Sequence, residues 1–323
     1  MNLSTNKKTF TFLLTFILCF NFLPLGAESS FKPPVLNSTD LAFNGPINAI
    51  VVDEKTGIVY LGGQFTQVGE NTGSGVSLDI PTGKLQMAFP KVNGPVLSVI
   101  SDGSKGWYIG GDFTSVGGIK RNCLAHVLSD ETVDPNWNPN ANNNVTALVK
   151  KRETIYIAGN FTKIGEKERG GLAAVGTDGN IQDWSPSVGG FVKALAIKGS
   201  IVYVGGDFNS IDEKERNNLA AIGTDGTLAN WNPNVKGSVS SIAISNSIIY
   251  IGGNFTKIAK TKRNDLAAIG IDGVLKDWNP NVDGNVNALA IKDSTIYVGG
   301  SFNTIDSESR ANFASFSILD KAN

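Results

Sequence analysis

The chain is poor in the residues that build metal sites and reactive centres. Its 323 residues include one histidine, two cysteines and two methionines. A structural zinc site needs about four His or Cys ligands, so a site of that kind is excluded. Cys123 is the only thiol left once the N-terminal leader described below is removed, and an internal disulfide is then impossible. We predict no metal site, no cofactor and no catalytic residues.

Strong charge of one sign is also absent. The chain has 28 basic and 29 acidic residues, and the mature part keeps 26 and 29 because Lys7 and Lys8 lie in the leader. Proteins that bind nucleic acids normally present a basic face. A nucleic-acid partner is therefore not expected.

One long apolar run is present, at the N-terminus. Lys7 and Lys8 precede uncharged sequence from Phe10 to Leu25, and the small pair Gly26-Ala27 follows it. This order is typical of a secretory signal peptide, so we predict a leader over 1–27 and an exported mature chain.

Two other interpretations of the leader stay open. A retained membrane anchor would use a run of roughly 17 residues, at the bottom of the spanning range. A lipid anchor on Cys19 is less favoured because the large Leu18 precedes it. With the leader removed, we expect no stable membrane insertion and a protein in the periplasm, at the cell surface or secreted.

The mature chain repeats a short motif six times. A glycine pair, written Ala-Gly in the third copy, recurs at intervals of 48 and 47 residues. All six tyrosines lie two residues before it: Tyr60, Tyr108, Tyr156, Tyr203, Tyr250 and Tyr297. A period of this length indicates stacked units that cannot bury their apolar faces alone.

Each repeat contains four segments with the character of β-strands. In the copy at 189–235 they are 192–197, 201–208, 219–223 and 228–231. They are rich in β-branched and aromatic residues, and turn residues separate them. Asp-Gly pairs at 178, 225 and 272 lie between the third and fourth segments, where such a pair favours a mirror-image hairpin turn.

An all-β architecture of radially repeated sheets follows. We predict one domain over 28–323, a six-bladed β-propeller with four antiparallel strands per blade, which acts as a monomer. The predicted repeats are 46–92, 93–141, 142–188, 189–235, 236–282 and 283–323. The last copy stops before its fourth strand, so a spare strand at about 35–43 is expected to complete the last blade and close the ring.

The motif combination resembles a known repeat. The run IYVGG-x-F, an arginine, LAAIG-x-DG and WNPN together resemble the bacterial delta-60 repeat over about 46–323. That resemblance implies an exported β-propeller whose biochemical role is largely undefined.

Positions shared by all repeats are expected to serve the scaffold. In one copy they are Tyr203, Gly205, Gly206, Phe208, Arg216 and Trp231. We expect the glycine pair to let an aromatic ring of the neighbouring sheet approach the backbone, the candidates being Phe89, Trp137, Trp184, Trp231 and Trp278. The recurring arginine (121, 169, 216, 263 and 310) could form an anion-binding ring, but five copies favour stacking or hydrogen bonding within the blades.

The remaining candidate groups favour structural roles. Asp178, Asp225 and Asp272 could be read as calcium ligands, but each loop offers one carboxylate, which favours a turn-forming role. His126 occupies a strand position where other repeats have Ala or Ser, and no second histidine or nucleophile motif accompanies it. Cys123 has the character of a buried apolar group.

A function that breaks the symmetry should use positions at which the repeats differ. The loops between the second and third strands differ most, and we place candidate binding residues there: Lys120, Lys167, Lys260 and Lys262. We expect a non-catalytic module that binds an extracytoplasmic protein or glycan. The alternatives are a hydrolase or lyase with its site in the central channel and a structural envelope component.

Overall fold

The protein is described from a computed structural model that covers residues 43–53, 58–68, 72–79, 85–86, 89–292 and 294–318. These ranges contain strands and no helix, so the predicted all-β class is confirmed. None of them holds a helix long and apolar enough to cross a membrane. The leader and residues 35–42 of the expected closing strand lie outside the described residues.

Each repeat forms its own antiparallel sheet. The first three sheets contain β1 (Ile47–Asp53), β2 (Ile58–Gly63), β3 (Gly75–Asp79) and β4 (Leu85–Gln86); β5 (Val96–Ser101), β6 (Trp107–Gly111) and β9 (Leu124–Val127); and β10 (Val145–Lys151), β11 (Thr154–Gly159) and β14 (Leu172–Gly176). The last three contain β15 (Val188–Lys198), β16 (Ile201–Ile211) and β18 (Leu219–Gly223); β19 (Val235–Ser245), β20 (Ile248–Ile258) and β22 (Leu266–Gly270); and β23 (Asn285–Lys292), β24 (Thr295–Ser301) and β27 (Phe313–Ser317).

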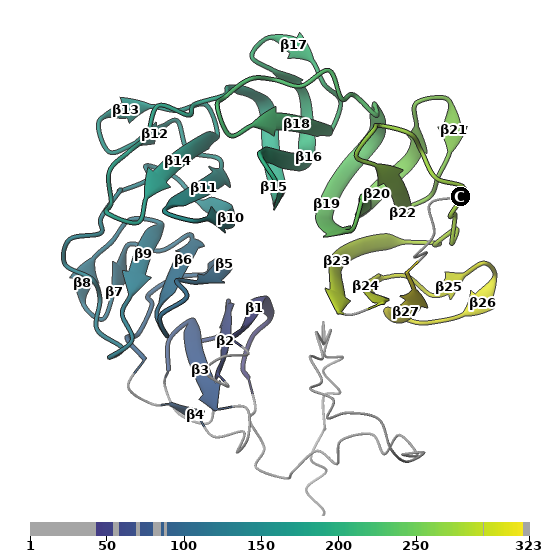
Figure 1. Ribbon diagram of the computed structural model, residues 1–323. Coiled ribbons are helices and arrows are strands. Elements are labelled where there is room, and N and C mark those ends of the chain that lie inside the picture. The colour runs from purple at the N-terminus through teal and green to yellow at the C-terminus, as the bar shows by residue number, and fades with distance from the viewer. Residues whose placement is uncertain are drawn as a thin grey trace, which may run out of the picture.

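The sheets follow one another around a central opening, with the first strand of each nearest the centre (Figure 1). Consecutive first strands contact each other from β1 to β23. Among the described strands no ladder joins the last sheet to the first. This radial order of like sheets is a propeller arrangement.

The predicted fourth strand is shorter than expected. In repeats two to five it is reduced to one bridging residue, as where Leu228 pairs with Ile222. The carbonyl of the next residue, Ala229, accepts a hydrogen bond from Arg216. The Arg216 side chain therefore takes the carbonyl that would accept a backbone hydrogen bond if the third and fourth strands paired over a longer stretch.

A short hairpin joins the second and third strands. Its arms are β7 (Ser115–Val116) with β8 (Ile119–Lys120), β12 (Lys163–Ile164) with β13 (Lys167–Glu168), and β25 (Thr304–Ile305) with β26 (Glu308–Ser309). In repeats four and five the second strand itself continues to pair with β17 (Lys214–Glu215) and β21 (Thr261–Lys262). The segment that follows Asn-Pro-Asn leads from one repeat to the next, and it lies beside the hairpin of that next repeat. Ala141 bridges to Ile164, and Val282 bridges to Ile305.

Two other turns lie together at the opposite end of the sheets. We call this end the turn face: it carries the first turn, between the first and second strands, and the third turn, after the third strand. Backbone amides of the third turn donate to carbonyls of the first turn in Thr177 to Glu153, Thr224 to Ser200 and Ile271 to Ser247, at 2.8–3.0 Å.

The third turn is not the mirror-image turn that its sequence favours. A mirror-image turn of that type needs positive φ at both central residues. Only the glycine of each Asp-Gly pair has it, at 84°, 91° and 85° for Gly179, Gly226 and Gly273. The aspartates instead accept a hydrogen bond from the amide two residues on. Their turn-forming role is confirmed, but with a different turn geometry.

The tryptophans lie between neighbouring repeats. Trp184 packs edge-on against Tyr156 of its own repeat, with ring centroids 5.0 Å apart. Its Nε1 donates to Gly223 O of the next repeat at 2.8 Å. Trp137 and Trp231 make the equivalent bonds to Gly176 and Gly270. The aromatic side chains therefore join each repeat to the next.

The prediction that these rings fill the space at the glycine pair is wrong. A Cβ on Gly205 would lie 2.7 Å from Cγ1 of Val239, in the next repeat. A Cβ on Gly206 would lie 2.1 Å from Phe191 O of its own sheet. A valine and a carbonyl occupy these spaces, and the aromatic rings approach the glycines of the third turns instead.

Candidate functional site

The recurring arginine joins two segments of its own repeat. Arg216 donates from Nη1 to Glu215 O and from Nη2 to Ala229 O, both at 2.8 Å. The same two bonds recur at Arg121, Arg169 and Arg263. Because both terminal nitrogens point at backbone carbonyls, the geometry favours the structural interpretation over an anion-binding ring.

Replacing Arg216 by Lys should destabilise the fold. A single ammonium cannot reproduce the forked geometry that reaches two carbonyls. We expect a loss of about 1 to 2 kcal/mol in the free energy of unfolding, measured by urea denaturation. Arg152 is exposed in a first turn and serves as control, with Arg152→Lys expected to change stability little. Equal losses for both variants would contradict this role.

One position of the scaffold carries a titratable group where another repeat has an amide. Asn218 accepts from Phe208 N at 3.0 Å and donates from Nδ2 to Val235 O at 2.8 Å. Asp265 takes the equivalent place and accepts from Phe255 N at 2.9 Å. Burial raises the pKa of Asp265 from 3.8 to about 6. An ionised carboxylate has no proton to donate as the amide does.

Asp265→Asn should therefore stabilise the protein near neutral pH. Because the pKa is higher in the folded state, the contribution of Asp265 is fully present below about pH 4 and is lost as the pH rises through about 6. Near pH 7 we expect the free energy of unfolding of the variant to be about 1 kcal/mol higher than that of the wild type, a value that allows for the partial exposure of the carboxylate. Near pH 4 we expect no difference. Thermal unfolding at both pH values measures it. The reverse change, Asn218→Asp, should destabilise only near neutrality; the opposite pH dependence would refute the assignment.

The candidate lysines of the second-to-third-strand loops are not brought together. Lys120, Lys167 and Lys262 lie in three different hairpins, β8, β13 and β21, and Lys260 lies in the turn before β21. All four are exposed, and the hairpins lie at the periphery of the molecule (Figure 1). Lys167 donates to Ile181 O at 3.1 Å. Only Lys260 and Lys262 share a hairpin.

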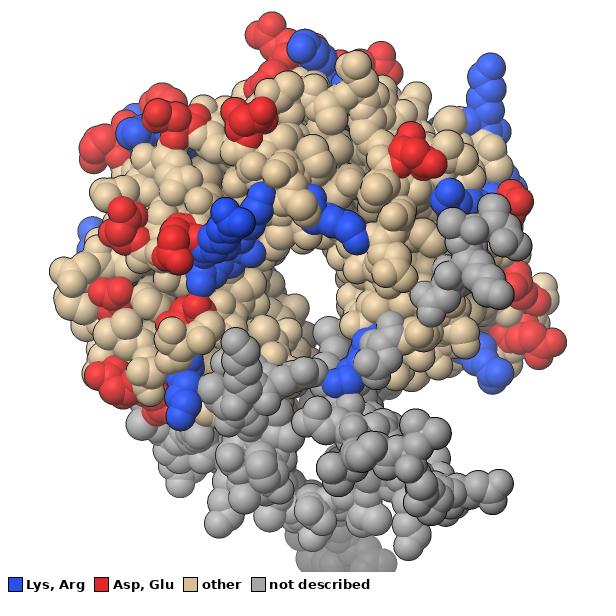
Figure 2. Space-filling view, in the orientation of Figure 1, with Lys and Arg blue, Asp and Glu red and all other residues tan. Residues whose placement is uncertain are grey.

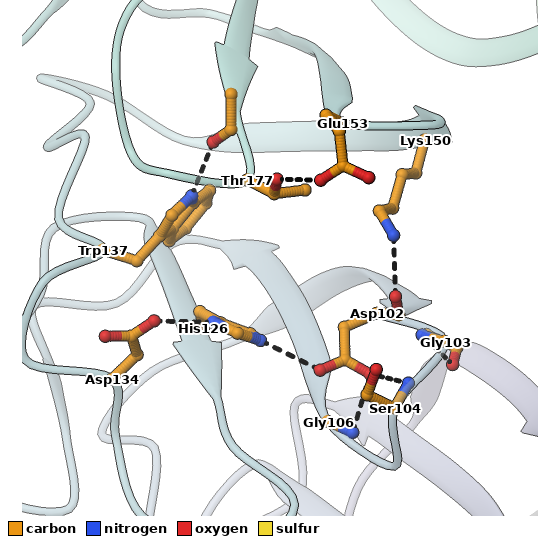
Figure 3. A network of polar contacts seen from close by, with 12 residues as sticks. Asp102, Gly103, Ser104, Gly106, His126, Asp134, Trp137, Lys150, Glu153 and Thr177 are labelled. Carbon is orange, nitrogen blue, oxygen red and sulfur yellow. Dashed lines mark hydrogen bonds and ion pairs between the residues drawn. The ribbon is translucent and has the colours of Figure 1, made fainter.

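The second repeat carries a polar network that the others lack (Figure 3). His126 on β9 places Nδ1 2.9 Å from Asp134 Oδ2 and Nε2 3.2 Å from Asp102 Oδ2. Its ring stacks on Tyr108 of β6, with centroids 4.2 Å apart. The network joins the first turn, the third strand and the segment after the third turn.

The environment of the network perturbs two of its groups. Partial burial by itself raises the pKa of Asp134, but the hydrogen bond from His126 and those from backbone amides outweigh it, so that pKa lies below its usual value. Burial, with the charges of Asp102 and Asp134, raises the pKa of Tyr108 to about 12. Tyr108 therefore stays a neutral phenol.

This arrangement acts as a brace. His126 is 7% exposed, and both ring nitrogens face carboxylates, so neither is free to take a proton from a substrate. Asp102 in turn accepts from the backbone amides of Ser104 and Gly106, which fixes the first turn. Within the described ranges, no group of three or more His, Cys, Asp or Glu side chains is placed to hold a metal ion. The geometry favours the structural role expected of His126.

Sequence reasoning missed the partners of His126, although a signal was present. The turns differ in sequence. Between paired strand residues the first turn has DGSKG where repeat four has KGSI, one residue fewer, and the third turn has LSDET where repeat four has GTDGT, of the same length. The first of these turns carries Asp102, and Asp134 follows the other. The repeats therefore differ strongly on the turn face as well as in the hairpins.

Cys123 is buried, as expected of an apolar group, and burial raises the pKa of its thiol. It has a φ of 62°, a conformation that Asn218, Asp265 and Asn312 also adopt at the equivalent positions.

Comparisons with known proteins support the fold alone. No family model matches the chain, and no curated protein matches it. Among solved structures, the chain is similar to the WD40 β-propeller domain of Doa1, with 12% identity and a TM-score of 0.54 over 78% of this chain and 74% of that one. It also matches the computationally designed protein Ika8, with 16% identity and a TM-score of 0.48 over 82% and 85% of the two chains.

Proposed function

We propose that the chain is an exported, non-catalytic interaction module that binds a protein or glycan outside the cytoplasm. One observation carries the proposal. The residues shared by the repeats are used inside the scaffold, as for Arg216 and Trp184, while the turns and hairpins that reach solvent differ from repeat to repeat. A rigid support with unlike loops is a common basis for binding.

Six blades with an N-terminal closure are part of this proposal. VLNSTDLAF at 35–43 aligns with VLKDWNPNV at 274–282, the fourth segment and crossover of repeat five. At the end of that alignment Phe43 bridges to Val68, as Val282 bridges to Ile305. In this register Leu36 would pair with Phe316, because Leu275 pairs with Ile269.

Engineered disulfides test the closure. A Leu36→Cys/Phe316→Cys double variant should form an intramolecular disulfide on mild oxidation, whereas Leu36→Cys/Ile269→Cys should not. The reverse result would exclude this closing strand.

The geometry supports binding over the enzymatic alternative. A channel enzyme would need acid and base groups on the strands that line the opening. The one histidine lies on a third strand, buried and bonded on both sides.

The test is binding of the mature chain, residues 28–323, to a glycan array and to a panel of extracellular proteins. We expect a saturable interaction that survives His126→Asn. Absence of binding, together with a hydrolase or lyase activity lost in that variant, would contradict the proposal.

A further inference from the structure

Basic side chains gather where the first strands reach the turn face. Lys150 and Lys151 end β10, and Arg152 follows them in the first turn. Lys198 ends β15 and Lys292 ends β23. The first strands are nearest the central opening (Figure 1). These residues, at the ends of three of the six first strands, therefore form a basic rim along part of its mouth, whereas β1, β5 and β19 end at Asp53, Ser101 and Ser245.

Two hydrogen bonds hold rim lysines along this edge. Lys150 Nζ donates to Asp102 O at 2.7 Å, and Lys198 Nζ donates to Asn246 O. Each bond reaches the first turn of a neighbouring repeat. The ammonium groups therefore lie beside the opening, and the space-filling view shows Lys and Arg bordering it (Figure 2).

The acidic side chains coloured in the space-filling view lie farther from the opening than the basic ones (Figure 2), although Asp53 ends β1, one of the strands beside it. Asp178, Asp225 and Asp272 belong to third turns, and their carboxylates are bonded to backbone amides. The mature chain has 26 basic and 29 acidic residues, so no strong general field attracts or repels a polyanion. An anionic ligand would be drawn to the centre of the face and repelled from its outer part.

Apolar side chains on the turn face indicate the kind of ligand. Ile271 and Val274 flank the third turn of repeat five and are 44% and 55% exposed. The equivalent residues of repeat four are Thr224 and Thr227. A polypeptide with both acidic and apolar side chains matches this combination better than a sulfated sugar chain.

Building on the proposed function, we propose that the basic rim on the turn face binds an acidic segment of a protein partner. Carboxylates of the segment would meet Lys151, Lys198 and Lys292, and its apolar side chains would contact Ile271 and Val274.

The probe is a fluorescein-labelled peptide of repeated Glu-Glu-Leu, with binding followed by anisotropy at low and near-physiological salt. We expect Lys151→Glu/Lys198→Glu/Lys292→Glu to weaken binding at least about tenfold, since three ion pairs with the peptide would be reversed. The matched control, Lys120→Glu/Lys260→Glu/Lys262→Glu, makes the same charge change in the hairpins and should alter binding less than about twofold. The same two triple variants made with Gln remove the positive charges without adding negative ones. Thermal melting curves of all variants show whether a loss of binding comes from unfolding.

Three results would overturn the inference: no binding to the wild-type protein, equal losses in both triple variants, or tighter binding to heparin with the same dependence on the rim. The inference would also be overturned if a partner found in the protein or glycan panel bound the rim variants as tightly as the wild type. That result would leave the proposed function intact.

Discussion

Trp184→Ala should be among the most destabilising single substitutions in the chain. The indole is buried between two repeats, packs on Tyr156 and donates to Gly223 O. Truncation would open a cavity at the junction and leave a buried carbonyl without its donor. We expect a loss of about 3 to 5 kcal/mol in the free energy of unfolding, measured by urea denaturation.

Two further variants separate the contributions of ring and hydrogen bond. Trp184→Phe keeps an aromatic contact and loses the N–H donor, so it should cost only about 1 to 2 kcal/mol. Trp278, which is half-buried and packs against Phe316 of the last repeat, should lose less than Trp184 on truncation to Ala. If Trp184→Ala cost no more than Trp278→Ala, the packing of the Trp184 indole between repeats three and four would not be a main source of stability.

Gly206→Ala should be far more damaging than Gly205→Ala, although the two glycines are adjacent. A Cβ on Gly206 would approach the Phe191 carbonyl oxygen to 2.1 Å and Val192 Cα to 2.9 Å. Relief requires separation of β15 from β16, and we expect a cost of about 3 kcal/mol or more. A Cβ on Gly205 meets side-chain atoms of Val239 and Ile242, which can shift.

The natural repeats agree with this difference. The first glycine position holds Ala158 in the third repeat, whereas the second is glycine in all six copies. Gly205→Ala should therefore cost about 1 kcal/mol. Thermal melting of both variants, made in the same background, gives the comparison. Equal destabilisation would mean that the backbone carbonyl moves as easily as the valine.

Much of the scaffold could be predicted from the chain because one pattern is repeated. The third strand of repeat four was expected at 219–223 and lies there. The second and first strands of that repeat extend to Ile211 and Val188, beyond the apolar runs used to find them. The added residues, VGGF at 188–191 and NSI at 209–211, have no alternating apolar pattern and continue the strands because their backbones pair with each other.

The polar details were harder to predict. The indole N–H of Trp231 donates to a carbonyl 39 residues away, that of Gly270. Nothing in the sequence around Trp231 distinguishes this role from packing against the glycine pair. Asp102 and Asp134 lie 24 and 8 residues from His126, and no other repeat has a histidine with which this pairing could be compared. The basic rim was missed because its lysines end three different strands, and only the radial arrangement brings those strand ends to one edge.

The most direct test of binding through the turn face is site-specific photo-crosslinking in the native cell. A photoreactive phenylalanine analogue at Thr227, exposed in a third turn, should give crosslinked adducts with a partner. The same group at Glu213, exposed in the hairpin of the same repeat, should give none. Adducts from Glu213 alone, or from neither position, would contradict the account.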